Sequence, residues 1–391
     1  AEQAALLAYR RAVIAAPDSD GAHAARRGIV DLAAASGQSA NTSRVALVEA
    51  EQDPEDVLAW ARELAATDTA EDARAAFDLA RALGAPLDER DVQFLDCHPP
   101  RWMASDEAYA SPLDDATRRA LIDDDRDGAL GDLLDLLGEV MPLVCPDARR
   151  ALVDADLLDA VRIPATSGGA ATAIYPQIAK ALGGPQTLLY TVARPAVPDL
   201  AVLLAAPPVI VLGPRLASTR AKSHADPATE LAGDTALRFQ LGRMVELARP
   251  RRLFAAGTDE DSFACLVAGL RHAFGPAPGD QVDARVDREI ANEGERLRGA
   301  LPVQLRRRIT ERLAAASASE LDPVAYIAAC RRAADRAGLV ACGDVAVALE
   351  LAGGPDAARH LVQLASTQRY LAARRSMRVR HVEDSTQPFT R

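Results

Sequence analysis

Apolar residues recur at helical spacing along most of the chain, in stretches separated by Gly, Pro and short polar turns. Between residues 1 and 90 this pattern predicts five helices. Ser19 or Asp20 is expected to cap the second, Pro54 to lie in the first turn of the fourth, and Gly84 to follow the fifth. Each pair of such helices leaves an apolar face uncovered, so stacked pairs would bury one another. Residues 1–90 are therefore predicted to form a helical-repeat solenoid.

The spacing of the apolar residues changes between residues 187 and 213. Three short apolar runs bounded by Gly and Pro predict strands at 187–193, 200–205 and 209–213. The preceding residues 91–164 are rich in turn formers near 97–115 and are expected to be a helical connector. Its helices are predicted at residues 116–122, 129–140 and 147–161, and a further helix at 171–182.

Helical spacing returns after the strands. Helices are predicted at residues 234–250, 262–274, 281–298, 303–316, 323–337, 344–351 and 355–375. Gly338 is expected to end the helix that begins at Pro323. The predicted fold class is thus mostly α with a small α+β part. A flexible basic tail is expected over 376–391, and the arginines of 369–380 form either a solvated helix end or a docking site for an acidic partner.

Composition narrows the class of protein. The 391 residues are 49% hydrophobic but only 4% aromatic, so Leu, Val, Ile and Ala must fill the core. A net charge of −11 argues against nucleic-acid binding. The longest apolar run, 200–213, is too short to span a membrane and is interrupted by Pro207 and Pro208. Five widely spaced cysteines indicate reduced thiols and a cytoplasmic location. The scarcity of lysine indicates a GC-rich bacterial genome, and the start at Ala1 indicates a piece of a longer protein.

Two separated segments carry the candidate chemistry. The first is DTALRFQLGRMVELARP (residues 234–250), and the second is RRAADRAGLVACGD (residues 331–344). A zinc peptidase of the His-Glu-x-x-His type needs two His one turn apart on a helix, with Glu beside the first as general base. The third ligand is a Glu on a later helix. The first segment has the helical spacing for such a site, but none of these residue types stands at the required positions.

These segments resemble the HtpX-type zinc metallopeptidases, over residues 170–352. Leu237, Arg238, Phe239 and Gly242 match the frame of that family's metal helix, and residues 334–339 match its later Ala-Asp-Arg-Ala-Gly-Leu phrase. In this register the four chemical positions are replaced: Arg243 and Leu247 stand at the histidine places, Met244 at the glutamate place and Arg331 at the third-ligand place.

The resemblance implies a degenerate zincin-like domain over 165–375 that binds no metal or cofactor and has no catalytic residues. Arginine is always protonated and offers a metal no lone pair. The resemblance also predicts that Arg243, Leu247 and Arg331 converge on two packed helices. In the N-terminal part, residues 8–19 (AYRRAVIAAPDS) resemble the second helix of a tetratricopeptide repeat.

A purely structural interpretation of the same helix remains open. Leu237, Leu241, Met244, Val245 and Ala248 recur at helical spacing and would form a core-facing stripe, which leaves Arg243 at the surface. Asp335 is then a structural partner for Arg331, Arg332 or Arg336.

Other chemistry has little support in the sequence. There is no Walker A loop, no Gly-x-Ser-x-Gly elbow and no Gly-x-Gly-x-x-Gly. Cys97 and His98 are adjacent but precede two prolines, which is typical of a loop. His224 lies in the polar loop before residue 234, next to the candidate helix, and is the histidine considered for a functional role.

The sequence as a whole predicts a non-catalytic scaffold. It would bind a protein partner or a peptide through a helical-repeat surface and a pseudo-peptidase domain. Two alternatives remain: an active hydrolase with an unrecognised site, for example one using His224 or a cysteine, and a purely structural protein in which the C-terminal part is also a solenoid.

Overall fold

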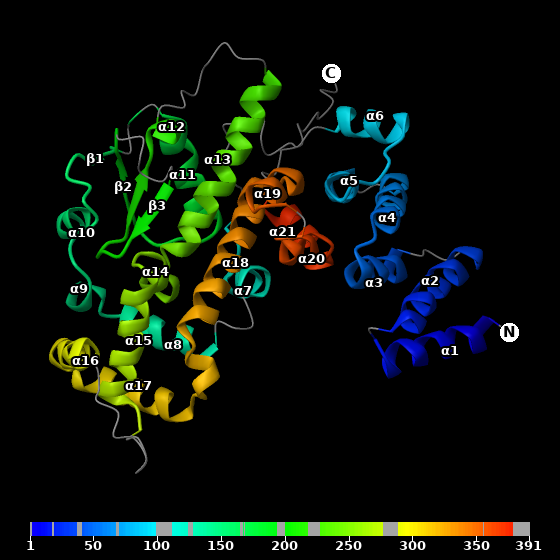
Figure 1. The fold of residues 1–391 in the computed structure, drawn as a ribbon. Coiled ribbons are helices and arrows are strands. Elements are labelled where there is room, and N and C mark those ends of the chain that lie inside the picture. The colour runs from blue at the N-terminus through cyan, green and yellow to red at the C-terminus, as the bar shows by residue number, and fades with distance from the viewer. Residues whose placement is uncertain are drawn as a thin grey trace, which may run out of the picture. The chain divides into compact units, whose positions relative to one another are not determined.

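The structure, a computed structural model, describes most of the chain (Figure 1). The described residues are 2–17, 19–36, 41–67, 70–98, 112–123, 128–164, 167, 169–193, 200–217, 227–276, 288–354 and 356–377. They are mostly helical with one four-stranded mixed sheet, which confirms the coarse fold class. None of the described helices is long and apolar enough to cross a membrane. His224 and residues 378–391 of the tail predicted over 376–391 lie outside the described residues, whereas Ser376 is the last residue of helix α21 (Gln368–Ser376).

The chain divides into two compact units. The first comprises Ala1–Leu113, Leu231–Ala236 and Cys342–Arg391, and the second comprises Asp114–Glu230 and Leu237–Ala341. This division differs from the predicted boundaries at residues 90, 164 and 375. The differences have two physical causes: the C-terminal helices pack with the N-terminal ones, and the predicted connector contributes to the core of the second unit.

The N-terminal helices of the first unit follow the predicted pattern. Each helix packs against the next along the chain. As predicted, Ser19 caps the second helix by accepting a hydrogen bond from the N–H of Ala22, and Pro54 lies in the first turn of the fourth, which Asp53 caps. The helices are α1 (Glu2–Ala15), α2 (Asp20–Ala35), α3 (Asn41–Glu51), α4 (Pro54–Ala66) and α5 (Ala70–Ala82).

A sixth helix, α6 (Glu89–Cys97), was not predicted. Its signal is a capping box, in which Asp88 and Asp91 each accept a hydrogen bond from the other's backbone N–H. Cys97 is its last residue, and the ring of His98 stacks on Phe94 with 4.2 Å between centroids. The pair Cys97–His98 therefore ends a helix.

The C-terminal helices α19 (Val345–Leu351), α20 (Arg359–Ala365) and α21 (Gln368–Ser376) pack against α5. The single helix predicted over 355–375 was wrong, because Thr367 interrupts it and caps α21 by accepting the N–H of Tyr370. Arg375 pairs with the buried Asp72 of α5. Residues far apart in the sequence thus share one core.

The sheet of the second unit has the strand order β1-β2-β4-β3 (Figure 1). Strands β2 (Leu188–Thr191), β3 (Leu200–Leu203) and β4 (Val209–Leu212) confirm the three predicted strands, whereas β1 (Val161–Arg162) was not predicted. The pair β2–β4 is parallel, and β1 and β3 are antiparallel to their neighbours. All four residues of β4 are buried. This sheet argues against a chain built only of helical repeats.

The helices of the second unit form a large hydrophobic cluster, which is separate from the smaller one at the sheet. Leucines of α8, in the predicted connector, are buried in that cluster together with side chains of α14, α15, α16, α17 and α18. The helices are α7 (Asp115–Ile122), α8 (Gly128–Gly138), α9 (Met141–Val144), α10 (Ala148–Asp154), α11 (Ala170–Ala181), α12 (Pro214–Ala217), α13 (Pro227–Leu247), α14 (Pro250–Ala256), α15 (Glu260–Phe274), α16 (Arg288–Ala300), α17 (Val303–Ala315), the 3-10 helix η2 (Ala318–Leu321) and α18 (Pro323–Cys342).

Helices α13 and α18 cross in close contact at two glycines. A Cβ at Gly242 would lie 2.6 Å from the Cβ of Ala341, and one at Gly338 would lie 2.7 Å from the ring of Phe239. Gly338 was predicted to end its helix, and this is wrong: α18 continues to Cys342, and Gly343, with φ of 65°, follows it. At Gly338 the absence of a side chain instead allows α18 to pack closely against α13.

Candidate functional site

The residues that the sequence predicts at degenerate zinc-site positions lie on α13 and α18, which run side by side in opposite directions (Figure 1). The Nε of Arg243 lies 2.8 Å from Oδ1 of Asp335, so the structure brings these two predicted residues together. The guanidinium of Arg243 also lies over the ring of Phe239, 5.8 Å from its centroid. Asp335 was expected to be a structural partner for an arginine of its own helix, and its ion pair with Arg243 also joins it to α13.

Arg331, Leu247 and Met244, at the other three predicted positions, do not take part in this ion pair. Arg331 is exposed and pairs with Glu260 of α15, with 3.0 Å between nitrogen and oxygen. Leu247 packs against the hydrophobic cluster, and Met244 is buried. Leu247 lies one turn beyond Arg243 on α13, and Arg331 one turn before Asp335 on α18. Because the helices run in opposite directions, these two turns lie toward the same end of the helix pair.

The described part of the chain contains many acidic residues and several histidines and cysteines, so their arrangement decides whether they could form a site. Within it, no three His, Cys, Asp or Glu side chains are grouped so that they could hold a metal ion. Burial raises the pKa of the Cys145 and Cys342 thiols to about 12, which keeps both protonated near neutral pH.

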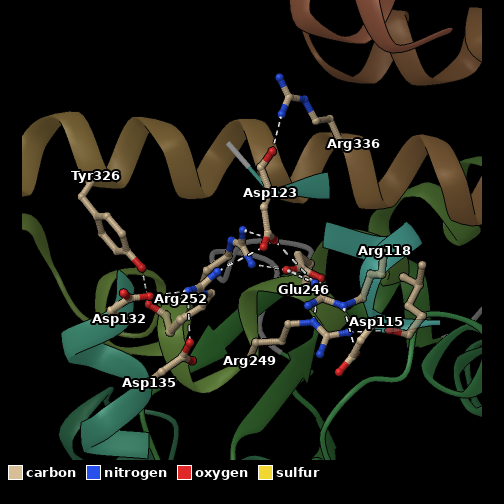
Figure 2. Close-up of polar contacts among 12 residues, drawn as sticks. Asp115, Arg118, Asp123, Asp132, Asp135, Glu246, Arg249, Arg252, Tyr326 and Arg336 are labelled. Carbon is tan, nitrogen blue, oxygen red and sulfur yellow. Dashed lines mark hydrogen bonds and ion pairs between the residues drawn. The ribbon is translucent and has the colours of Figure 1, made fainter. Parts of the chain in front are cut away.

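A buried network of charged side chains lies where α7, α13 and α14 meet (Figure 2). Glu246, at the end of α13, has no exposed surface, and it pairs with three arginines. Arg252 is equally buried and pairs directly with it, Arg249 donates to it at 2.8 Å, and Arg118 of α7 lies 3.6 Å away. Burial alone would raise the pKa of Glu246, but Arg252, Arg249 and Arg118 together hold it below its ordinary value.

Asp123 is the second acid of the network, and it joins α14 and α18 to the end of α7. Its carboxylate lies 3.0 Å from Arg252 and 3.1 Å from Arg251 of α14, and its carbonyl accepts a hydrogen bond from Arg336 of α18 at 2.8 Å (Figure 2). Tyr326, also on α18, donates its hydroxyl to the carbonyl of Arg251. The network therefore fixes the turn between α13 and α14, where Pro250 begins the second helix.

The direction of the backbone groups at the outer edge of β3 follows from the neighbouring ladder. The N–H groups of Leu188 and Val192 donate to the carbonyls of Pro208 and Leu212. In β4 the even-numbered residues therefore face β2, and the odd-numbered residues Val209 and Val211 face β3.

The partners of those odd-numbered residues in β3 are Leu203 and Ala201. The N–H and C=O groups of Leu200, Val202 and Leu204 consequently point away from the sheet. The N–H of Leu204 donates to the carbonyl of Gly257, just after α14, at 3.1 Å. A Cβ at Gly257 would collide with the backbone of Leu204, so only glycine permits this approach. The edge of β3 is thus closed at one end, and among the described residues no backbone group pairs with the outward-facing groups of Leu200 and Val202.

Comparisons of the chain with models of protein families, with curated proteins and with solved structures gave no match. The interpretation of the site therefore depends on the geometry of its own residues.

Proposed function

We propose that the protein is a non-catalytic scaffold whose second unit holds an extended peptide segment of a protein partner at the edge of β3. The observation that carries this proposal is the pair of outward-facing peptide units at Leu200 and Val202, with Gly257 closing the end of the edge. A peptide that adds to a sheet edge gains its affinity from main-chain hydrogen bonds and its specificity from alternate side chains.

The pair Arg243–Asp335 supports a degenerate zincin-like origin for the second unit. A histidine that binds a metal usually donates its other ring N–H to a carboxylate, which orients the ring. Asp335 lies against residue 243 as such a carboxylate would lie against a first histidine ligand. With arginine at that position the same contact becomes an ion pair between two helices. This pair would stabilise the scaffold without metal chemistry.

The helical stack of the first unit supports a second binding surface in the same protein. Successive helix pairs α1–α2, α2–α3, α3–α4 and α4–α5 pack in chain order, which is the arrangement that gives tetratricopeptide-like repeats an extended surface. The proposal therefore assigns partner binding to both units and peptide hydrolysis to neither.

A proline at the edge of β3 tests strand addition. Peptides selected from a random displayed library against the full chain should lose about tenfold or more in affinity for Leu200→Pro, because the substitution removes an outward-facing donor. The first residue of an edge strand tolerates proline, and the ladder to β4 does not use this N–H. Titration by fluorescence anisotropy measures the loss, and amide hydrogen exchange should show that the peptide protects the N–H of Val202.

The matched control is Val303→Pro, which places proline at the exposed first position of α17, where helices accept it. It should leave binding unchanged. Peptides that bind Leu200→Pro as tightly as the unmodified chain, or that leave the amide of Val202 unprotected, would refute strand addition at this edge. Recovery of cleaved peptide would refute the non-catalytic assignment separately.

A further inference from the structure

The outward face of α1 carries an unusual combination of exposed apolar and unpaired basic side chains. Leu7 is 52% exposed and Ile14 is 80% exposed, and the two are two turns apart on one face of the helix. The exposed Arg10 and Arg11 flank this pair on its two sides. Within the described residues neither arginine has an acidic partner.

The opposite face of α1 already has its neighbour. Leu6, Tyr9 and Val13 are half-buried and point toward α2, where the ring of Tyr9 fills the space above Gly28. The exposed face is therefore separate from the contact that builds the helical stack. It is a surface with an apolar ridge and two positive charges.

We infer that this face of α1 binds an acidic amphipathic helix of a protein partner. The apolar side of such a helix would cover Leu7 and Ile14, and its carboxylates would lie opposite Arg10 and Arg11. This inference deepens the part of the proposed function that concerns the helical-repeat surface, and it does not depend on the edge of β3.

A second copy of the chain is a poorer occupant of this face. If α1 packed against its own copy in opposite directions, with Leu7 against Ile14, the two-fold axis would pass between residues 10 and 11. The arginines of both copies would then meet at the centre of the contact, and like charges placed opposite one another oppose association. Carboxylates on the partner remove this repulsion and add steering of the encounter.

Two synthetic helical peptides test the inference on the full chain. Both span about three heptads with Leu and Ile at a and d; one carries Glu at e and g, and its twin carries Lys there. The glutamate peptide should bind about tenfold or more tightly than the lysine peptide, by fluorescence anisotropy of a labelled peptide. The double variant Arg10→Glu, Arg11→Glu should reverse this preference, and added salt should weaken the preferred pairing.

The apolar part of the face has its own variant and control. Ile14→Glu should weaken binding of the glutamate peptide by about tenfold or more. Val303→Glu, at a residue of α17 that is 76% exposed, should leave this affinity unchanged. Equal binding of the two peptides, or no effect of Ile14→Glu, would overturn the inference. A dimer in analytical ultracentrifugation that becomes a monomer in Ile14→Glu would assign the face to a second copy instead. Neither outcome depends on Leu200→Pro, so failure here is distinguishable from failure at β3.

Discussion

Replacing Glu246 by Gln is expected to lower the free energy of unfolding of the second unit by about 3–5 kcal/mol. Glu246 and Arg252 are both fully buried and pair directly, so the substitution leaves Arg252 with only part of its compensating charge. Arg249 and Arg118 lose the same partner. Urea denaturation followed by circular dichroism measures the change, with the slope of the transition checked for two-state behaviour.

The double variant Glu246→Gln, Arg252→Met separates loss of a contact from burial of an unpaired charge. It should recover part of the stability, because the buried cation is removed together with its partner. The matched control is Glu139→Gln, which breaks the exposed pair with Arg308 and should have little effect. If Glu246→Gln is no more destabilising than Glu139→Gln, the buried network does not hold the junction of α13 and α14.

Lowering the pH should also reveal the contribution of Glu246 to the stability of the folded protein. The pKa of Glu246 in the folded protein lies below its ordinary value, so its stabilising contribution is complete above the ordinary glutamate pKa of about 4.3. The contribution is lost as pH falls from there through the folded pKa. The unmodified protein should therefore lose stability in this acidic range more steeply than Glu246→Gln. Parallel slopes would show that Glu246 does not titrate as its surroundings require.

Replacing Gly242 by Ala is the second change with a large expected effect. The added Cβ would lie 2.6 Å from the Cβ of Ala341 and 2.9 Å from the carbonyl of Ala337, so α13 and α18 would have to move apart. Overpacking of this kind costs about 1–3 kcal/mol, against a gain of about 1 kcal/mol in helix propensity. A net loss of stability is therefore expected in thermal unfolding followed by circular dichroism.

Gly299→Ala is the matched control, because a Cβ at Gly299 of α16 meets no atom within 4 Å. The same chemical change should there stabilise the helix by about 0.5–1 kcal/mol. The two variants are thus expected to differ in sign. A stabilising effect of Gly242→Ala would mean that the two helices are not in close contact at this position.

The local elements were predictable where one residue determines them. Ser19 caps α2 and Pro54 lies in the first turn of α4, as expected, and the apolar runs around residues 187–213 form the expected strands. Such signals act over a few residues and do not depend on what the element packs against. The two-residue strand β1 has no such signal, because its residues are exposed and are defined only by pairing with β2.

Long-range packing accounts for what the sequence did not reveal. Gly338 has the appearance of a helix end, but its place opposite Phe239 depends on a helix about 100 residues earlier in the chain. Asp72 and Arg375 are ordinary surface residue types until α21 packs on α5. The second unit's charge network was missed for the same reason: Glu246 lies far along the sequence from Arg118 and Asp123 and meets them only in the fold.

The candidate site was predictable in part. The sequence placed Arg243 and Asp335 in two segments of interest, and the structure brings them into an ion pair. The sequence did not predict the ion pair between Arg331 and Glu260 of α15. The backbone edge of β3 could not be derived from side chains at all, because the direction of each N–H is set by the strand register.

The zinc content of two proteins tests the account most directly. One is the unmodified full chain, and the other is the variant Arg243→His, Leu247→His, Arg331→Glu, which places three zinc-ligand types at the positions that the proposal treats as degenerate. After saturation with zinc and desalting, elemental analysis should find one zinc per chain in the folded variant and none in the unmodified protein. Stoichiometric zinc in the unmodified protein, or a folded variant that binds none, would contradict the degenerate zincin-like scaffold.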